Sequence, residues 1–141
     1  MSVRYIKNAK NLAHLFVSFN AITTIPDVIF QHEGLTRVDL STNDIAYLPP
    51  MKMDNIIDFY ISNNSLTTLP ENLFNRKYIG MIVVDGNQLT NLPDTCGSVA
   101  TTLRYLAVAR NNLTQFPTSS QNNIKHHPIN CFQHHPTTNL Q

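Results

Sequence analysis

The feature that most constrains this chain is a frame of apolar residues, one asparagine and one proline that recurs five times. In each copy, three spaced apolar positions precede the asparagine, and two more precede the proline. The asparagines are Asn20, Asn43, Asn64, Asn87 and Asn111, at intervals of 23, 21, 23 and 24 residues. A fixed period in this range is typical of a solenoid, in which each repeat contacts only its neighbours. Such a chain is expected to present a surface more than a reaction centre.

Every position of the frame is filled in every copy. The first copy is Leu12, Leu15, Val17, Asn20, Ile22, Ile25 and Pro26, and the fifth is Leu103, Leu106, Val108, Asn111, Leu113, Phe116 and Pro117. The frame resembles the leucine-rich-repeat family, in its typical class of about 23 residues per repeat. The resemblance implies an α/β fold of about five repeats. It is a curved solenoid with a parallel sheet on the concave face and short helical, 3₁₀ or irregular return segments on the convex face.

The residue pattern independently predicts a short strand in each copy. Leu15 and Val17 alternate with Phe16, as Val38 and Leu40 alternate with Asp39, which is the period of two of a strand with one buried face. Equivalent strands are expected to pair in parallel, so that Leu40, Ile61 and Val84 line up in one interior column.

The recurring asparagines and prolines have structural interpretations. A short amide both donates and accepts, so a stacked asparagine ladder can satisfy the backbone groups of successive turns. Residues 26–30 and 70–74 each place a proline at the first helical position before an acidic residue, which predicts one short helical turn. Extended or 3₁₀ backbone is expected in the second and fourth return segments.

The chain divides into three predicted segments. Residues 1–10 are expected to be a partial repeat or an N-terminal cap, 11–117 five leucine-rich repeats, and 118–141 a disordered, polar, histidine-rich tail. Pro128 interrupts the place where a sixth strand would fall. The tail carries His126, His127, Cys131, His134 and His135. Their spacing matches no common structural zinc site, so no metal site is predicted.

Composition narrows the classes of partner. The formal net charge is +1 and charged residues make up 13% of the chain, which gives no electrostatic footprint for nucleic acid or a membrane surface. No apolar run is long enough to span a membrane. Cys96 and Cys131 form no closely spaced pair, which slightly favours a cytoplasmic over an extracellular location. Two sequons favour the opposite and make Asn63 and Asn112 possible glycosylation sites.

The side chains between the buried positions are expected to line the concave face. These candidate ligand-binding residues are His14, Phe16, Arg37, Asp39, Asp58, Tyr60, Met81, Val83 and Tyr105. Arg37 and Asp58 occupy equivalent positions on adjacent strands, so we expect them to form an exposed ion pair. Tyrosine and arginine are enriched at the energetic centres of protein interfaces, which favours a protein partner.

The sequence predicts neither enzymatic activity nor a cofactor. Asp39 and Asp58 would lie at a separation used by glycosidases, but an open sheet offers no pocket that raises a carboxyl pKa. The leading prediction is a non-catalytic protein-interaction module that uses the concave face. The alternative is a fragment of the sensing region of a larger leucine-rich-repeat receptor or receptor-like kinase. It is suggested by the two sequons and by ends that carry no cysteine-rich cap.

Overall fold

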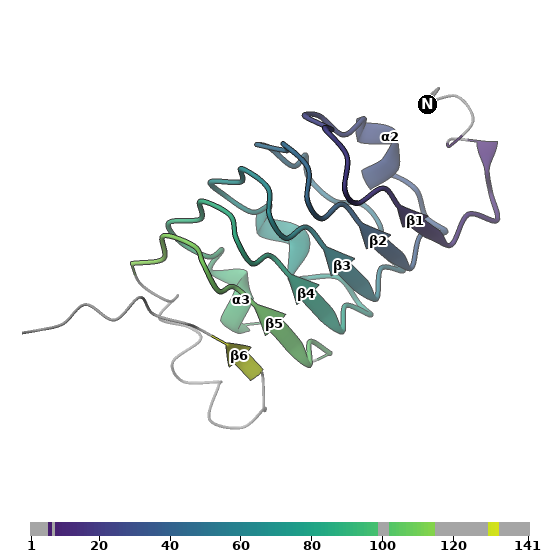
Figure 1. The fold of residues 1–141 in the computed structure, drawn as a ribbon. Helices are drawn as coiled ribbons and strands as arrows, with labels where there is room; N and C mark the ends of the chain where they lie inside the picture. The colour runs from purple at the N-terminus through teal and green to yellow at the C-terminus, as the bar shows by residue number, and fades with distance from the viewer. Residues whose placement is uncertain (1–5, 7, 99–101, 115–129, 133–141) are drawn as a thin grey trace, which may run out of the picture.

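The computed structural model describes residues 6, 8–98, 102–114 and 130–132, and its regular elements form a solenoid around one parallel sheet (Figure 1). The strands are β1 His14–Phe16, β2 Arg37–Asp39, β3 Asp58–Tyr60, β4 Met81–Val83, β5 Tyr105–Ala107 and β6 Asn130–Phe132. They lie in chain order and every neighbouring pair is parallel. The predicted strands and their parallel pairing are therefore confirmed.

The core lies between the sheet and the return segments. Leu40, Ile61 and Val84 directly follow β2, β3 and β4, and each is 0% exposed. Because the strands pair without slippage, these side chains occupy equivalent places in one interior column, as the alternation predicts. Phe30 and Phe74 close the opposite side of this core and are also buried.

The return segments lie on the side of the solenoid away from the strands (Figure 1). They contain α2 Asp27–Phe30, the 3₁₀ turn η1 Glu71–Leu73, and α3 Thr95–Ser98. The short turns predicted after Pro26 and Pro70 are present, but each proline is the N-cap residue, with extended ψ angles of 136° and 132°. The predicted position was therefore one residue too far into the helix.

The second return contains no helix, as expected, and buries Met51 and Met53 instead. The fourth return corrects the prediction of extended or 3₁₀ backbone, because α3 is a short α-helix. The hydroxyl of Thr95 donates to the Glu71 carbonyl at 2.6 Å, which anchors the start of α3 to the preceding repeat. Tertiary contact here outweighs the weak helix preference of the local sequence.

The sheet gains β6 inside the segment that the sequence predicts to be disordered. Residues 130–132 pair with β5, with Cys131 opposite Leu106. Pro128 precedes this strand and does not interrupt it, so the argument from proline did not apply to these three residues. The rest of 118–141, including the tail histidines, lies outside the described residues.

Asparagine side chains link each described turn to the turn before it. Asn64 illustrates the arrangement: its Oδ1 accepts the Ile45 N–H at 2.9 Å, and its Nδ2 lies 3.0 Å from the Leu40 carbonyl oxygen. The same Nδ2 also lies within hydrogen-bonding distance of two carbonyls of its own turn. Equivalent bonds surround Asn43, Asn87 and Asn111. Among the residues that the structure describes, Asn20 bonds to two carbonyls of its own turn and to no other repeat.

A left-handed backbone conformation precedes each ladder asparagine. The residues are Phe19, Thr42, Asn63, Gly86 and Arg110, with φ between 52° and 65°. A left-handed residue reverses the chain sharply, which brings the following amide back over its own strand. Glycine adopts this conformation without steric cost, asparagine tolerates it, and a β-branched threonine is the least suited.

We predict that Asn64→Ala lowers the free energy of unfolding by about 3 kcal/mol, because it leaves several buried backbone groups unpaired. Asn20→Ala is the matched control and should cost about 1 kcal/mol, since Asn20 is exposed and its bonds to described residues lie within its own turn. Urea unfolding followed by circular dichroism measures both values. Equal losses for the two variants would contradict a bridging role for Asn64.

We predict that exchanging residues at the left-handed position changes stability in opposite directions. Thr42→Gly should raise the free energy of unfolding by about 1 kcal/mol, because it removes a β-branched side chain from a φ of 55°. Gly86→Ala should lower it by about 1–2 kcal/mol, since the new methyl group would also collide with the Asn63 side chain. The midpoints of urea unfolding compare the two variants with the wild type. Midpoints that shift in the same direction for both variants would contradict a left-handed strain at Thr42 and Gly86.

Candidate functional site

The strand register arranges the predicted ligand-binding residues in two rows on the concave face. The first row is His14, Arg37, Asp58, Met81 and Tyr105, and the second is Phe16, Asp39, Tyr60, Val83 and Ala107. The middle residue of every strand from β1 to β5 is buried, so the flanking residues face the other way. Ala107 is an exception within its row, because it is only 2% exposed.

Two aromatic rings lie at the β1 end of the concave face. The His14 and Phe16 rings stack with centroids 5.8 Å apart and an interplanar angle of 29°. Phe16 is still 57% exposed. Sequence alternation places both residues on the face, but their stacking depends on side-chain rotamers that the alternation does not define.

The centre of the concave face is charged. Arg37 Nη2 and Nε lie 2.7 Å and 2.9 Å from Asp58 Oδ2, so the predicted ion pair is present. Asp39 turns one carboxylate oxygen to the Ser41 N–H at 2.9 Å. Asp58 and Asp39 therefore both have hydrogen-bonding partners within the protein.

Tyr60 connects the charged centre to the apolar half of the face. Its hydroxyl donates to Met81 Sδ at 3.1 Å. Partial burial raises the pKa of Tyr60 above its ordinary value, the Asp58 and Asp39 charges raise it further, and Arg37 opposes them. The phenol is therefore held in its neutral, hydrogen-bonding form between carboxylates and a thioether.

A carboxylate just beyond the two rows was not among the predicted site residues. Asp85 follows β4, and its Oδ1 accepts the Ala109 N–H of the next repeat at 2.7 Å. Asp85 thus stabilises the turn after β5. Its equivalents in the three preceding repeats are serines, and this difference within the frame is the sequence signal that could have identified it.

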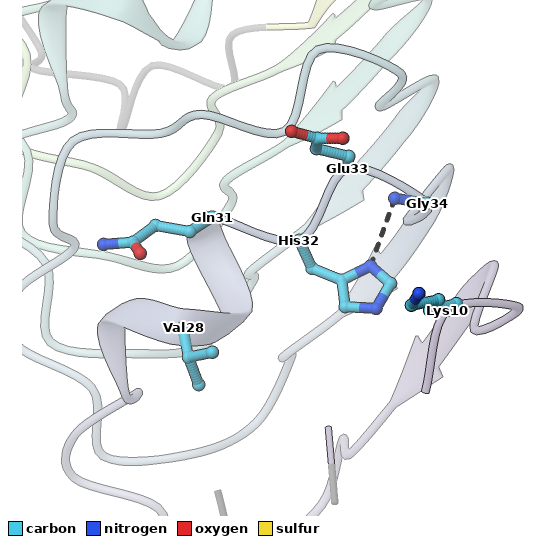
Figure 2. A pocket seen from close by; sticks show the side chains of 6 residues that line it. All are labelled: Lys10, Val28, Gln31, His32, Glu33 and Gly34. Atoms are coloured by element: carbon cyan, nitrogen blue, oxygen red, sulfur yellow. Dashed lines mark hydrogen bonds between the residues drawn. The ribbon is translucent and has the colours of Figure 1, made fainter. Parts of the chain in front are cut away.

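A hollow of about 420 Å³ lies near α2, away from the concave face (Figure 2). It is lined by Lys10, Val28, Gln31, His32, Glu33 and Gly34. His32 Nε2 lies 3.1 Å from the Ala9 carbonyl oxygen, and its Nδ1 accepts the Gly34 N–H at 3.2 Å. The imidazole therefore joins the segment before β1 to the first return. No repeat pattern marks this hollow, so it was not predicted from the sequence.

Other predicted features have simple positions. Asn63 and Asn112 are both exposed. Within the described residues, no three histidine, cysteine, aspartate or glutamate side chains group closely enough to hold a metal ion. No helix among those residues has the length and apolar character needed to cross a membrane.

Comparisons with known proteins find similarity at the level of structure. A scan against protein-family models and a search of curated proteins both find no match. A solved leucine-rich-repeat protein of Leptospira interrogans superposes with a TM-score of 0.70, at 21% identity, over 92% of this chain and 38% of that one.

Two further solved leucine-rich-repeat proteins are similar. YopM from Yersinia enterocolitica gives a TM-score of 0.61 at 24% identity, over 76% of this chain and 21% of that one. InlP of Listeria monocytogenes gives 0.63 at 21% identity, over 86% and 39%. The chain thus spans about two fifths or less of the length of these proteins. The repeat frame, the parallel sheet and these superpositions together show that the chain has the leucine-rich-repeat fold.

Proposed function

We propose that the chain is a non-catalytic protein-binding module whose ligand docks on the concave face. The observation that carries this proposal is a contrast within one repeated frame. The interior positions of successive repeats are chemically alike, whereas the first concave row changes from histidine to arginine, aspartate, methionine and tyrosine. A varied surface on a uniform framework is what discrimination between ligands requires.

The shape of the fold supports the same proposal. Solenoids present extended concave surfaces, and proteins of this architecture use them for binding. The alternative, in which the chain belongs to the sensing region of a larger receptor, also uses this surface and stays a prediction. Both interpretations therefore place the ligand over β1 to β5.

The concave face offers three kinds of contact. Phe16 supplies an exposed aromatic surface at one end. The Arg37 side chain is 47% exposed, and its guanidinium has more N–H groups than Asp58 engages. Met81 and Val83 supply a half-buried apolar strip. A ligand with an apolar anchor beside polar backbone or side-chain groups would match this order.

The size of the sheet limits how much of a ligand it can cover. Five three-residue strands, each about 10 Å long and about 4.8 Å apart, present a projected face on the order of 240 Å². A standard protein interface buries roughly 800 Å² on each partner. The ligand is therefore expected to reach beyond the two rows and contact the flanking loops as well.

We predict that the double variant Tyr60→Ala/Tyr105→Ala loses at least about tenfold in partner capture, because truncating aromatic anchors typically costs more than 1 kcal/mol each. The matched control is Tyr47→Ala, which removes a tyrosine that is 67% exposed and lies outside both rows. Capture from cell extracts by immobilised chain, quantified by mass spectrometry, compares the three proteins, and circular dichroism checks their folding. Equal capture by the double variant and the wild-type chain would refute binding through this face.

We also predict that Asp58→Asn lowers the pKa of Tyr60, because it removes a negative charge beside the phenol and leaves Arg37 in place. The raised pKa of the folded protein stabilises it fully below the ordinary value of 10.0, and this contribution is lost as pH rises through the folded value. The variant should therefore lose less stability than the wild type in alkali. NMR titration of labelled tyrosine rings measures the pKa. Asp44→Asn, at an exposed site off the face, is the control and should leave it unchanged.

A further inference from the structure

Three of the four methionines lie in the described part of the chain, and they have two different environments. Met51 and Met53 are 0% exposed and belong to the hydrophobic core. Met81 is half-buried in β4, on the concave face. A thioether is oxidised only where an oxidant reaches its sulfur, so a buried methionine reacts when its surroundings open. The fold therefore leaves Met81 the most accessible of these three side chains.

The sulfur of Met81 also has a specific hydrogen-bond donor. Strands β3 and β4 are adjacent and parallel, and the Tyr60 hydroxyl donates to Met81 Sδ at 3.1 Å. Burial and the nearby Asp58 charge raise the pKa of Tyr60 above its ordinary value. The phenol therefore keeps the proton that it donates to the sulfur at neutral pH.

This hydrogen bond makes the two sides of the sulfur unequal. A thioether sulfur carries two lone pairs, and oxygen added to one or to the other gives one or the other sulfoxide epimer. The Tyr60 O–H engages one lone pair and leaves the second free for attack on an oxidant. Oxidation of Met81 in the folded chain is therefore expected to give one epimer in excess.

We propose that Met81 is a modification site for peroxides, at which Tyr60 directs the oxygen to one side of the sulfur. The free lone pair attacks one oxygen of hydrogen peroxide, so that the S–O bond forms as the O–O bond breaks. The sulfur loses two electrons and the peroxide is reduced. The proton on the transferred oxygen passes to the departing hydroxide, and the products are methionine sulfoxide and water. Tyr60 is a positioning residue, since it exchanges no atom with the peroxide.

The modification would change the chemistry of the concave face. Met81 and Val83 form a half-buried apolar strip. Oxidation places a polar S=O group in this strip, and methionine sulfoxide reductases reverse the change. An effect on ligand binding rests on the proposed function, whereas the oxidation itself does not. An experiment without a ligand therefore tests the modification site separately from the proposed function.

The sequence separates the three methionines for measurement. Cleavage after lysine and arginine places each of them on its own peptide, namely 38–52 with Met51, 53–76 with Met53 and 78–104 with Met81. The folded chain is treated with dilute hydrogen peroxide, digested and analysed by mass spectrometry. The Met81 peptide should be oxidised at least about tenfold faster than the other two. In concentrated urea the three rates should agree within about twofold, because burial no longer protects the core.

Two methionine sulfoxide reductases, each specific for one epimer, measure the epimer ratio on the digested 78–104 peptide. This peptide is identical in the wild type, Tyr60→Phe and Tyr47→Phe, so a difference between them arises in the folded chain. The wild type should show an excess of about fivefold, and Tyr60→Phe nearly equal epimers, since it removes only the hydroxyl. Tyr47→Phe, at an exposed site outside both rows, should keep the wild-type excess. Circular dichroism checks that the variants are folded.

The two measurements can each overturn the proposal. Equal oxidation rates for the three peptides of the folded chain would show that Met81 has no preferred reactivity. Nearly equal epimers in the folded wild type would refute the directing role of Tyr60, and so would an excess that Tyr60→Phe retains. The comparison of folded and urea-treated wild type decides the first two points without any variant.

Discussion

The hydrogen bonds of Asn43, Asn64, Asn87 and Asn111 hold the architecture together, because each of these side chains joins its own turn to the turn of the preceding repeat. The Asn64 side chain accepts the Ile45 N–H and donates to the Leu40 carbonyl. One amide therefore fixes the turn after β3 against the turn of the preceding repeat. Each ladder asparagine also reaches carbonyls of its own turn, and the residue before it adopts the left-handed conformation that reverses the chain there. Thr42 and Phe19 accept that conformation despite the steric cost that glycine at position 86 avoids.

The ladder also explains why repeats of unequal length can stack without slippage. The intervals between ladder asparagines vary from 21 to 24 residues. The return segments absorb the difference with an α-helical turn, a 3₁₀ turn or no helix at all. The segment from the start of each strand to its ladder asparagine has the same length in every repeat. Arg37 therefore pairs with Asp58 regardless of the length of the return segment between them. The side chains of the concave face lie in regular rows because this length is constant.

The sequence predicted those parts of the structure that depend on periodicity. The strands, the interior column and the Arg37–Asp58 pair all follow from counting residues within the frame. It did not predict α3, whose start is anchored by a bond between Thr95 and another repeat. Nor did it predict β6, because Pro128 was expected to lie within a sixth strand, whereas β6 begins at Asn130. These elements depend on tertiary contacts that no local pattern records.

In the candidate site, the sequence predicts where residues lie on the sheet but not the conformation of their side chains. Register places Tyr60 beside Met81, but only the rotamers decide that the phenol donates to the sulfur. The hollow around His32 arises where the segment before β1 meets the first return, and it has no counterpart in the repeat frame. Periodic positions are predictable because the same pattern recurs in several repeats. The contact between the segment before β1 and the first return occurs only once, so no pattern in the sequence reveals it.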